Sequence, residues 1–316
     1  MPLSYLLLAA GMAASQQGGG QPAHEAAAEV LIRRIESADA RIESIGYRLA
    51  TANASLCSMP VSMTGIRLQS RARYAPNYRA ALGSRAPVFI EAVVPGSPAA
   101  AVGLMPGDGV RAIDDDTSIG SAVPESTLPT LNALDTAYAK LFTPSASGVT
   151  TLSVQRGPSE QRFTIRGVPG CRSRFELVLG KSYIADADGE TIRIGAGFVE
   201  RLADDRLAAV MAHELAHNIL GHPARRTREG VANGIFAEFG RSARLIRKME
   251  DEADRLSLRL LARSGYDPHA AIDLWREDGV AISGALGRGP SHRGSRSRAE
   301  LMERELSAWD NARPTP

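Results

Sequence analysis

The chain has 316 residues, 44% of them apolar and 23% charged, which is the composition of a globular protein with room for about two domains. Its 37 lysines and arginines nearly balance 35 aspartates and glutamates, so composition gives no support to a nucleic-acid partner. Two cysteines are too few for a disulfide scaffold, although Cys57 and Cys171 can pair once in an oxidising compartment. We expect that single structural disulfide.

Residues 1–20 have the pattern of a secretory signal peptide. An apolar run over residues 3–10 is followed by small residues, and it is far shorter than the ~20 residues that cross a bilayer. The run lacks the basic residues that usually precede it. We expect a periplasmic or secreted protein, with a cytoplasmic one as the alternative. No later segment reaches membrane-spanning length, so we expect no integral span after this segment.

Residues 24–55 are predicted to form a long amphipathic helix. Apolar residues recur every three or four positions at Leu31, Ile35, Ala38, Ile42, Ile45 and Leu49. The opposite face carries charged residues: Arg33, Arg34, Glu36, Asp39, Arg41, Glu43 and Arg48. Barely three heptads are present, so packing within the chain is favoured over a dimeric coiled coil.

The next domain, residues 80–168, is predicted to be rich in strands. Strands are expected near residues 88–94 and 110–113, with a short helical piece at 99–102. A helix over 131–142 and a hairpin of 151–155 with 162–166 follow, the hairpin turning at Gly157, Pro158 and Ser159.

Residues 94–114 of this domain resemble the core signature of bacterial-type PDZ domains. They read Val-Pro-Gly-Ser-Pro-Ala-Ala-Ala-Val-Gly-Leu-Met-Pro-Gly-Asp-Gly-Val-Arg-Ala-Ile-Asp. The resemblance implies a module that can bind an extended peptide end beside an edge strand. Its carboxylate-binding loop is expected at residues 81–85, where the usual Gly-Leu-Gly-Phe motif is missing. A peptide ligand and a purely structural or inhibitory module both remain open.

The last domain, residues 172–310, is expected to hold the chemistry. Strands are predicted near residues 175–179, 182–185 and 191–194. A helix follows, capped by Asp204 or Asp205 and ending before Gly221.

That helix contains the sequence His-Glu-Leu-Ala-His. Four helical residues advance about 6 Å and turn about 40° beyond a full circle, so His213 and His217 project from one side toward a single cation. Tetrahedral Zn²⁺ suits such a site, and Glu214 lies where it can act on a water molecule there as general base. Ordinary packing of the histidines on an amphipathic helix is the alternative.

A third ligand is expected 33 residues beyond His217, on a second predicted helix. Glu250 and Asp254 share one face of that helix, whereas Glu252 points about 200° away from Glu250. Glu250 can therefore bind the metal, and Asp254 can accept the free N–H of a ligand histidine. We expect one Zn²⁺ per chain.

These motifs, together with Gly189–Gly195 and Arg263–Pro268 as written in this chain, are similar to the gluzincin family that includes the peptidases HtpX and BepA and the CAAX prenyl endopeptidases. The resemblance implies an α+β fold in which a PDZ-like, strand-rich domain precedes a mostly helical metallopeptidase domain with a small edge-strand sheet. It also implies that His292 and Arg298 face the metal, His292 as an oxyanion donor or gating ligand and Arg298 as a charge stabiliser. The proline that family members carry after the equivalent histidine is replaced by Arg293. A solvated basic tail is the alternative for both residues.

His222 lies nine residues after His213 and is expected to pack at the helix end rather than bind zinc. The resulting prediction is a metalloendopeptidase that cuts unfolded or exposed protein segments in envelope protein quality control. One strand is expected to line the cleft and pair with substrate, through Thr191, Ile192, Arg193 and Ile194. The alternative is a PDZ-type binding or scaffold protein whose peptidase domain is latent or inactive.

Overall fold

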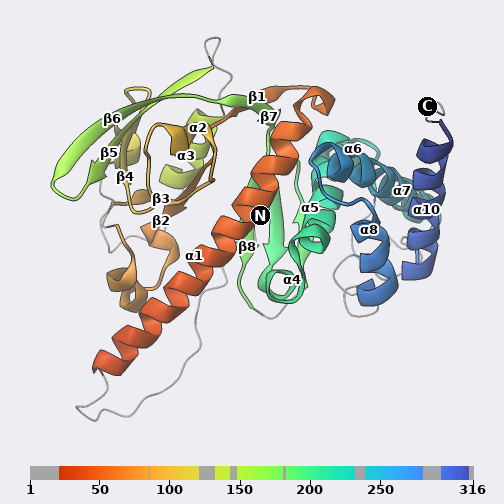
Figure 1. Cartoon of the computed structure of the whole chain (residues 1–316), viewed down its shortest axis with the longest axis horizontal. Helices are drawn as coiled ribbons and strands as arrows, with labels where there is room; N and C mark the ends of the chain where they lie inside the picture. Colours follow the sequence, from red (N-terminus) through yellow and green to blue (C-terminus); the bar gives the residue numbers. More distant parts are fainter. Residues whose placement is uncertain are drawn as a thin grey trace. The chain divides into compact units, whose positions relative to one another are not determined.

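A computed structural model of the chain describes residues 21–84, 86–120, 132–142, 148–180, 183–231, 239–279 and 293–312 (Figure 1). The predicted signal-like segment and His292 lie outside these residues. The chain divides into two compact units: unit 1 is Met1–Ser44 with Val61–Pro169, and unit 2 is Ile45–Pro60 with Gly170–Pro316. Both helices and sheets are present, as the expected α+β class requires.

Helix α1 (Gln21–Ala52) forms where the amphipathic pattern predicts it, and a 3₁₀ turn (Ala54–Leu56) follows. Four residues of the predicted apolar face are buried: Ile35, Ile42, Ile45 and Leu49. Asp39 and Glu43 were predicted on the charged face opposite the apolar one, but they are only 2% and 7% exposed. Both carboxylates are buried because Arg67 of unit 1 pairs with them.

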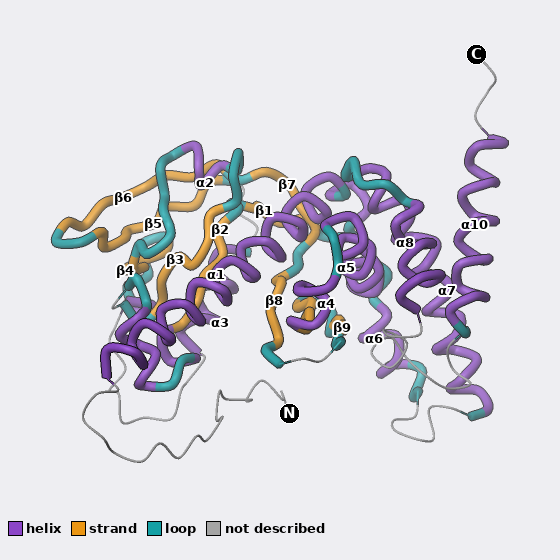
Figure 2. The backbone as a smooth tube through the Cα atoms, turned by 60° about the horizontal axis from the view of Figure 1, so that its bottom comes forward, coloured by secondary structure: helices purple, strands orange, loops and turns teal. Residues whose placement is uncertain are grey.

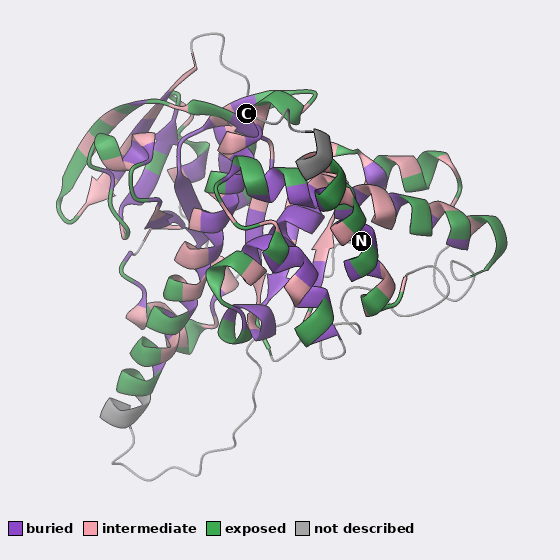
Figure 3. Ribbon diagram, turned by 45° about the vertical axis from the view of Figure 1, so that its right-hand side comes forward, coloured by how far each residue is buried: buried purple, intermediate pink, exposed green. Residues whose placement is uncertain are grey.

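Unit 1 is built on a five-stranded antiparallel sheet with the order β2-β3-β4-β5-β6. Its strands are β2 (Ile66–Ser70), β3 (Val88–Val93), β4 (Gly109–Ile113), β5 (Val149–Arg156) and β6 (Ser159–Arg166). The helices are α2 (Pro98–Ala101) and α3 (Asn132–Leu141), with 3₁₀ turns at Arg71–Arg73, Pro76–Ala81 and Ser118–Gly120. Apolar side chains of the strands and of α3 form one core, including Leu68, Ile90, Val110, Leu134 and Leu152. The buried residues of the chain are purple in Figure 3.

The sheet order corrects where a peptide could add a strand. The predicted carboxylate-binding loop at residues 81–85 precedes β3, but β3 lies inside the sheet between β2 and β4. The strand at the edge next to β3 is β2, and β6 forms the other edge of the sheet. Sequence patterning missed β2, which lies before the expected domain boundary at residue 80. The outward backbone groups of Leu68 on β2 are already used: its N–H donates to the Tyr138 hydroxyl at 3.0 Å, and that hydroxyl donates to the Leu68 carbonyl at 3.1 Å.

Strands β1 (Pro60–Met63) and β7 (Val168–Cys171) pair in a small two-stranded sheet. They lie at the start and at the end of residues 61–169, the part of unit 1 that separates the two stretches of unit 2 in the sequence. The expected disulfide joins Cys57 and Cys171, whose Cα atoms are 5.5 Å apart. Both cysteines belong to unit 2.

Unit 2 is mostly helical (Figure 2). The sheet has the order β8-β10-β9, with β8 (Arg174–Val178), β9 (Ala185–Ala187) and β10 (Thr191–Gly195). The helices are α4 (Ala196–Arg201), α5 (Asp204–Ile219), α6 (His222–Arg228), α7 (Gly240–Arg263), α8 (His269–Asp273) with a π-helical continuation (Leu274–Asp278), and α10 (Ser295–Ala312).

The end of α1 is tied to α7 within unit 2. The buried Asn53 amide donates to the Leu260 carbonyl at 3.1 Å and to the Ser264 hydroxyl at 3.0 Å. Gly46 lies so close to Phe175 of β8 that an added Cβ would come within 2.4 Å of the ring, so only glycine fits there. Within the described residues, none of the helices combines the length and apolar character needed to cross a membrane.

Candidate metal centre

Helix α5 carries the predicted metal-binding motif in a buried setting. Its N-cap is Ala203 rather than the predicted Asp204 or Asp205. Both aspartates lie in the first turn, where their negative charges interact favourably with the positive end of the helix dipole. Residues 207–216 are all buried. The helix ends at Ile219, and Gly221 follows with a φ of 63°, as the predicted helix stop requires.

The three predicted ligands meet at one point. The Nε2 atoms of His213 and His217 are 3.1 Å apart. Glu250 of α7 reaches between them, with one carboxylate oxygen 3.3 Å from Nε2 of His213 and the other 3.5 Å from Nε2 of His217. The three ligand atoms lie within 4.8 Å of one another. Two imidazoles and one carboxylate from two packed helices are the protein ligands of a catalytic zinc site with one open position.

The charges around this point fit a cation. Burial and Arg298 lower the pKa of His213, but its hydrogen bonds to Asp254 and Glu250 outweigh them and raise it to about 9. Burial alone would raise the pKa of Glu250, yet the neighbouring histidines hold it well below its usual range. Burial lowers the pKa of His217 to about 3, so this imidazole is neutral and offers a lone pair. Without a metal, the proton that His213 retains places a positive charge among the three ligand side chains. A divalent cation can supply positive charge there in place of that proton.

Asp254 lies behind His213, as predicted. Its Oδ1 is 3.0 Å from Nδ1 of His213, so it fixes the tautomer in which Nε2 is free for a metal. Arg298 of α10 binds both oxygens of Asp254, with Nε donating to Oδ2 at 2.8 Å. The guanidinium also stacks on the Trp275 ring, 3.8 Å from its centroid.

Arg298 is therefore not part of a solvated tail, because its side chain is only 2% exposed. Its Nη2 lies 3.9 Å from a Glu250 oxygen, so it holds ligand residues in place from behind. Its partner in the prediction, His292, lies outside the described residues, and the role expected for His292 remains a prediction.

Glu214 is buried beside the ligands on α5. Burial raises the pKa of the Glu214 carboxyl to about 7; His213 opposes the shift, and Glu250 and Asp186 add to it. A carboxyl that gains and loses a proton near neutral pH suits the predicted role of general base.

The predicted substrate strand needs correction. Residues Thr191, Ile192, Arg193 and Ile194 lie in β10, which is the central strand of the three. Strand β8 pairs with one side of β10 and β9 with the other, so the β10 backbone is not available to an extended peptide. The edge strand that packs near α5 is β9 (Ala185–Ala187). Local patterning marks β10 as a strand, but strand order depends on long-range pairing.

Two polar residues near the centre, His222 and Glu252, were not predicted to act on the metal ligands. His222 is buried and contacts His217, and Glu252 contacts His222. Sequence reasoning placed Glu252 away from Glu250 on the helix, which is correct, but it could not show that α6 lies on that side.

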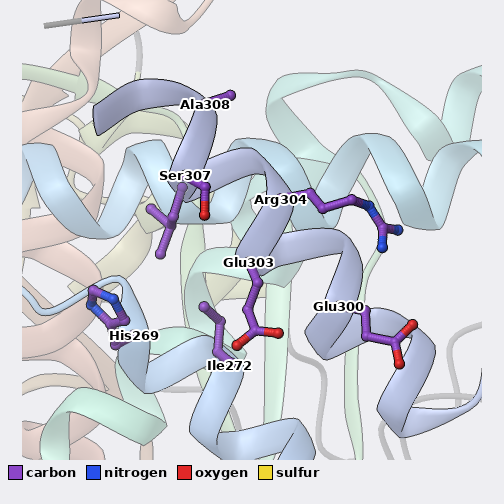
Figure 4. A pocket seen from close by; sticks show the side chains of 8 residues that line it. His269, Ile272, Glu300, Glu303, Arg304, Ser307 and Ala308 are labelled. Carbon is purple, nitrogen blue, oxygen red and sulfur yellow. The ribbon is translucent and has the colours of Figure 1, made fainter. Parts of the chain in front are cut away.

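A separate hollow of about 580 Å³ lies between α8 and α10 (Figure 4). His269 and Ile272 line it from α8, and Glu300, Glu303 and Arg304 from α10. None of the predicted metal ligands lines this hollow, and Glu303 is already paired with Arg276.

Comparisons with known proteins agree with the metal centre. Residues 183–245, which include His213, Glu214 and His217, match Peptidase family M48. Over 124 residues the chain is 31% identical to the mitochondrial metalloendopeptidase OMA1 of Schizosaccharomyces pombe; the match covers 34% of this chain and 36% of that protein. The chain thus spans about a third of the length of this curated relative. The two findings support a zinc metallopeptidase family and metalloendopeptidase activity.

Proposed function

We propose that this chain is a zinc-dependent endopeptidase that hydrolyses peptide bonds in unfolded or exposed protein segments. The observation that carries the proposal is the convergence of His213, His217 and Glu250, with the buried Glu214 beside them. His213 and His217 come from α5 and Glu250 from α7, and the three ligands leave one side of a tetrahedral site for substrate.

A zinc ion held by these three side chains would supply a Lewis acid for the scissile carbonyl and for a water molecule. Glu214 then accepts a proton from the attacking water and delivers it to the leaving amine, since its raised pKa suits both steps. Asp254 keeps His213 oriented, and Arg298 keeps Asp254 ionised and in place.

Substrate is expected to bind as an extended strand along β9. This strand is an edge of the sheet, and Arg193 of β10 holds Asp186 of β9 through a hydrogen bond from Nε at 3.0 Å. An extended segment can add to such an edge, whereas a folded domain cannot present one readily. Unfolded or loop-exposed protein is therefore the proposed substrate class.

The cellular location of the enzyme and the role of unit 1 are also proposals. The signal-like segment at residues 1–20 and the pairing of Cys57 with Cys171 favour a periplasmic or secreted protein over a cytoplasmic one, and a role in envelope protein quality control. The PDZ-like module of unit 1 is proposed to regulate or support the peptidase. Tyr138 already occupies the Leu68 backbone groups at the β2 edge, which favours this role over recruitment of a peptide end.

The test compares the full chain with Glu214→Gln and with Glu200→Gln, an exposed glutamate of α4 that serves as a matched control. Zinc content is measured together with cleavage of an unfolded protein such as casein. We expect about one zinc in all three proteins. Cleavage should fall by at least about 10²-fold in Glu214→Gln alone, because only this variant lacks the proton acceptor.

Two results would contradict the proposal. A chain that binds no zinc has no catalytic metal centre. A chain that binds zinc but cuts nothing, with or without Glu214, supports the rival function of a PDZ-type binding protein with a latent peptidase domain.

A further inference from the structure

His222 is the first residue of α6, yet it lies against the metal ligands of α5. The left-handed conformation of Gly221, at a φ of 63°, ends α5 and turns the chain back so that His222 meets His217. The His222 side chain is 1% exposed. A buried imidazole needs hydrogen-bond partners for both ring nitrogens, and His222 has them.

One nitrogen of His222 faces His217. The two Nδ1 atoms are 2.9 Å apart, and the rings are nearly perpendicular, at 73°. The other nitrogen, Nε2, lies 3.1 Å from a carboxylate oxygen of Glu252. The contacts therefore run in one line from Glu252 through His222 to His217.

Only one arrangement of protons satisfies this line when a metal is bound. A metal on Nε2 of His217 leaves the proton on Nδ1, so His217 donates to His222. Nδ1 of His222 is then the acceptor, and the His222 proton must be on Nε2. A carboxylate oxygen of Glu252 is placed to accept the hydrogen bond that this Nε2–H donates.

Glu252 is itself held in place. Arg225 of α6 donates to the same carboxylate oxygen from Nη1 at 3.0 Å, and Nζ of Lys248 lies 3.8 Å from the other oxygen. Arg225 is fixed in turn by Glu229 at 2.8 Å. The carboxylate at the end of the line is thus held in place and directed at His222.

We propose that His222 and Glu252 are positioning residues that hold His217 in the tautomer and orientation needed to bind zinc through Nε2. The inference rests on the proposed zinc centre. Each ligand histidine then has its own carboxylate: Asp254 contacts His213 directly, and Glu252 acts on His217 through His222. A hydrogen bond to the second ring nitrogen makes an imidazole a better ligand and typically changes metal affinity by 10–100-fold.

The test measures the zinc dissociation constant of the full chain by competition with a chromophoric chelator. The variants are His222→Phe and Glu252→Ala. The control is His269→Phe, which removes an exposed histidine paired with Asp267 at 3.0 Å in the same unit. We expect zinc binding about 10–100-fold weaker for His222→Phe, a smaller loss for Glu252→Ala, and no change for the control.

A second readout separates positioning from a loss of folding. In zinc-loaded protein labelled with ¹⁵N-histidine, His222 should appear as the Nε2–H tautomer and His217 as the Nδ1–H tautomer. In Glu252→Ala, His222 should lose its fixed tautomer while urea unfolding of the zinc-free chain changes little, since Glu252 is partly exposed. Should His222→Phe fail to fold, Glu252→Ala still decides the matter.

Zinc affinities of His222→Phe and Glu252→Ala within twofold of the unmodified chain would contradict the positioning role of His222 and Glu252, while leaving the zinc centre intact. An Nδ1–H tautomer at His222 would overturn it as well. If the unmodified chain binds no zinc, the proposed function and the positioning role of His222 and Glu252 fail together.

Discussion

Two arginines of unit 2 bind aspartates of α7 in the same bidentate way but at different depths. Arg298 and Asp254 are 2% and 1% exposed. Arg293 and Asp251 are 34% and 16% exposed, with hydrogen bonds of 2.6 Å and 2.8 Å. Burial should decide what each pair contributes, because a buried charge that loses its partner cannot be solvated.

Replacing Arg298 by methionine should lower the free energy of unfolding by about 3–5 kcal/mol, since it leaves the Asp254 carboxylate buried without its cation. Arg293→Met should cost less than about 1 kcal/mol, because water can replace the guanidinium there. Urea unfolding of both variants in the presence of a zinc chelator, followed by circular dichroism, compares the two losses. Equal losses would contradict the buried position of Arg298.

At the scale of elements, α1 is joined to the sheet of unit 1 by a buried ionic cluster. Arg67 of β2 lies 2.5 Å from Asp39 of α1 and 2.7 Å from Glu91 of β3, and Glu43 of α1 is 4.0 Å away. The Tyr74 hydroxyl donates to Glu91 at 2.9 Å. One guanidinium thus serves three carboxylates, more than it can neutralise.

The excess of carboxylates predicts a stability that depends on pH. Burial raises the pKa of Asp39; Arg67 opposes the shift and Glu91 adds to it. A carboxyl whose pKa is higher in the folded chain binds its proton more tightly when folded. Its contribution to stability is therefore complete below the unfolded pKa of about 3.9 and is lost as the pH rises through the folded value.

Asp39→Asn has no proton to lose at this position, so its stability relative to the unmodified chain should increase as the pH rises from about 4. The measurement is the free energy of unfolding of both proteins by circular dichroism across a pH series. Asp115→Asn, at a carboxylate that is 78% exposed, is the matched control for the change from carboxylate to amide. A difference for Asp39→Asn that stays constant would mean that Arg67, rather than burial, controls this carboxyl.

Sequence could predict those features that depend on spacing within one helix. His213 and His217 share a face because helix geometry fixes it, and the same holds for Glu250 and Asp254 on α7. The meeting of α5 with α7 does not follow from helix geometry; it was predicted because the two histidines need a third ligand, and the family resemblance agrees with it. Asp39 was misjudged because its partner, Arg67, lies on a strand that the patterning did not reveal.

Features that depend on long-range pairing could not be read from the sequence. Strand β10 was predicted correctly as a strand, but its central place in the sheet comes from pairing with β8 and β9. The edge position of β2 and its closure by Tyr138 have the same origin. His222 was predicted to be a packing residue because its contact with Glu252 joins two different helices, at positions thirty residues apart in the chain.

For the molecule as a whole, the order of the chain makes most of unit 1 an insertion into unit 2. Residues Val61–Pro169 leave and re-enter unit 2 between Pro60 and Gly170. The Cys57–Cys171 disulfide joins the two ends of this insertion within unit 2, across a sequence separation of 114. The bond therefore fixes the short segment Ile45–Pro60 to the rest of unit 2 whatever the state of the inserted residues.

Loss of this bond should destabilise unit 2 in particular. A loop of this length corresponds to a loss of roughly 2–5 kcal/mol in the free energy of unfolding when the cysteines are replaced, because the unfolded chain regains freedom. Both tryptophans of the chain, Trp275 and Trp309, belong to unit 2, so their fluorescence follows that unit alone during urea unfolding. The double variant Cys57→Ser/Cys171→Ser should unfold at lower urea by this signal. A phosphine reductant should shift the unmodified chain to the same midpoint and leave the double variant unchanged.

If the double variant kept the unmodified midpoint, the packing of Asn53 against Leu260 and Ser264 would be enough to hold Ile45–Pro60, and the disulfide would not be structural.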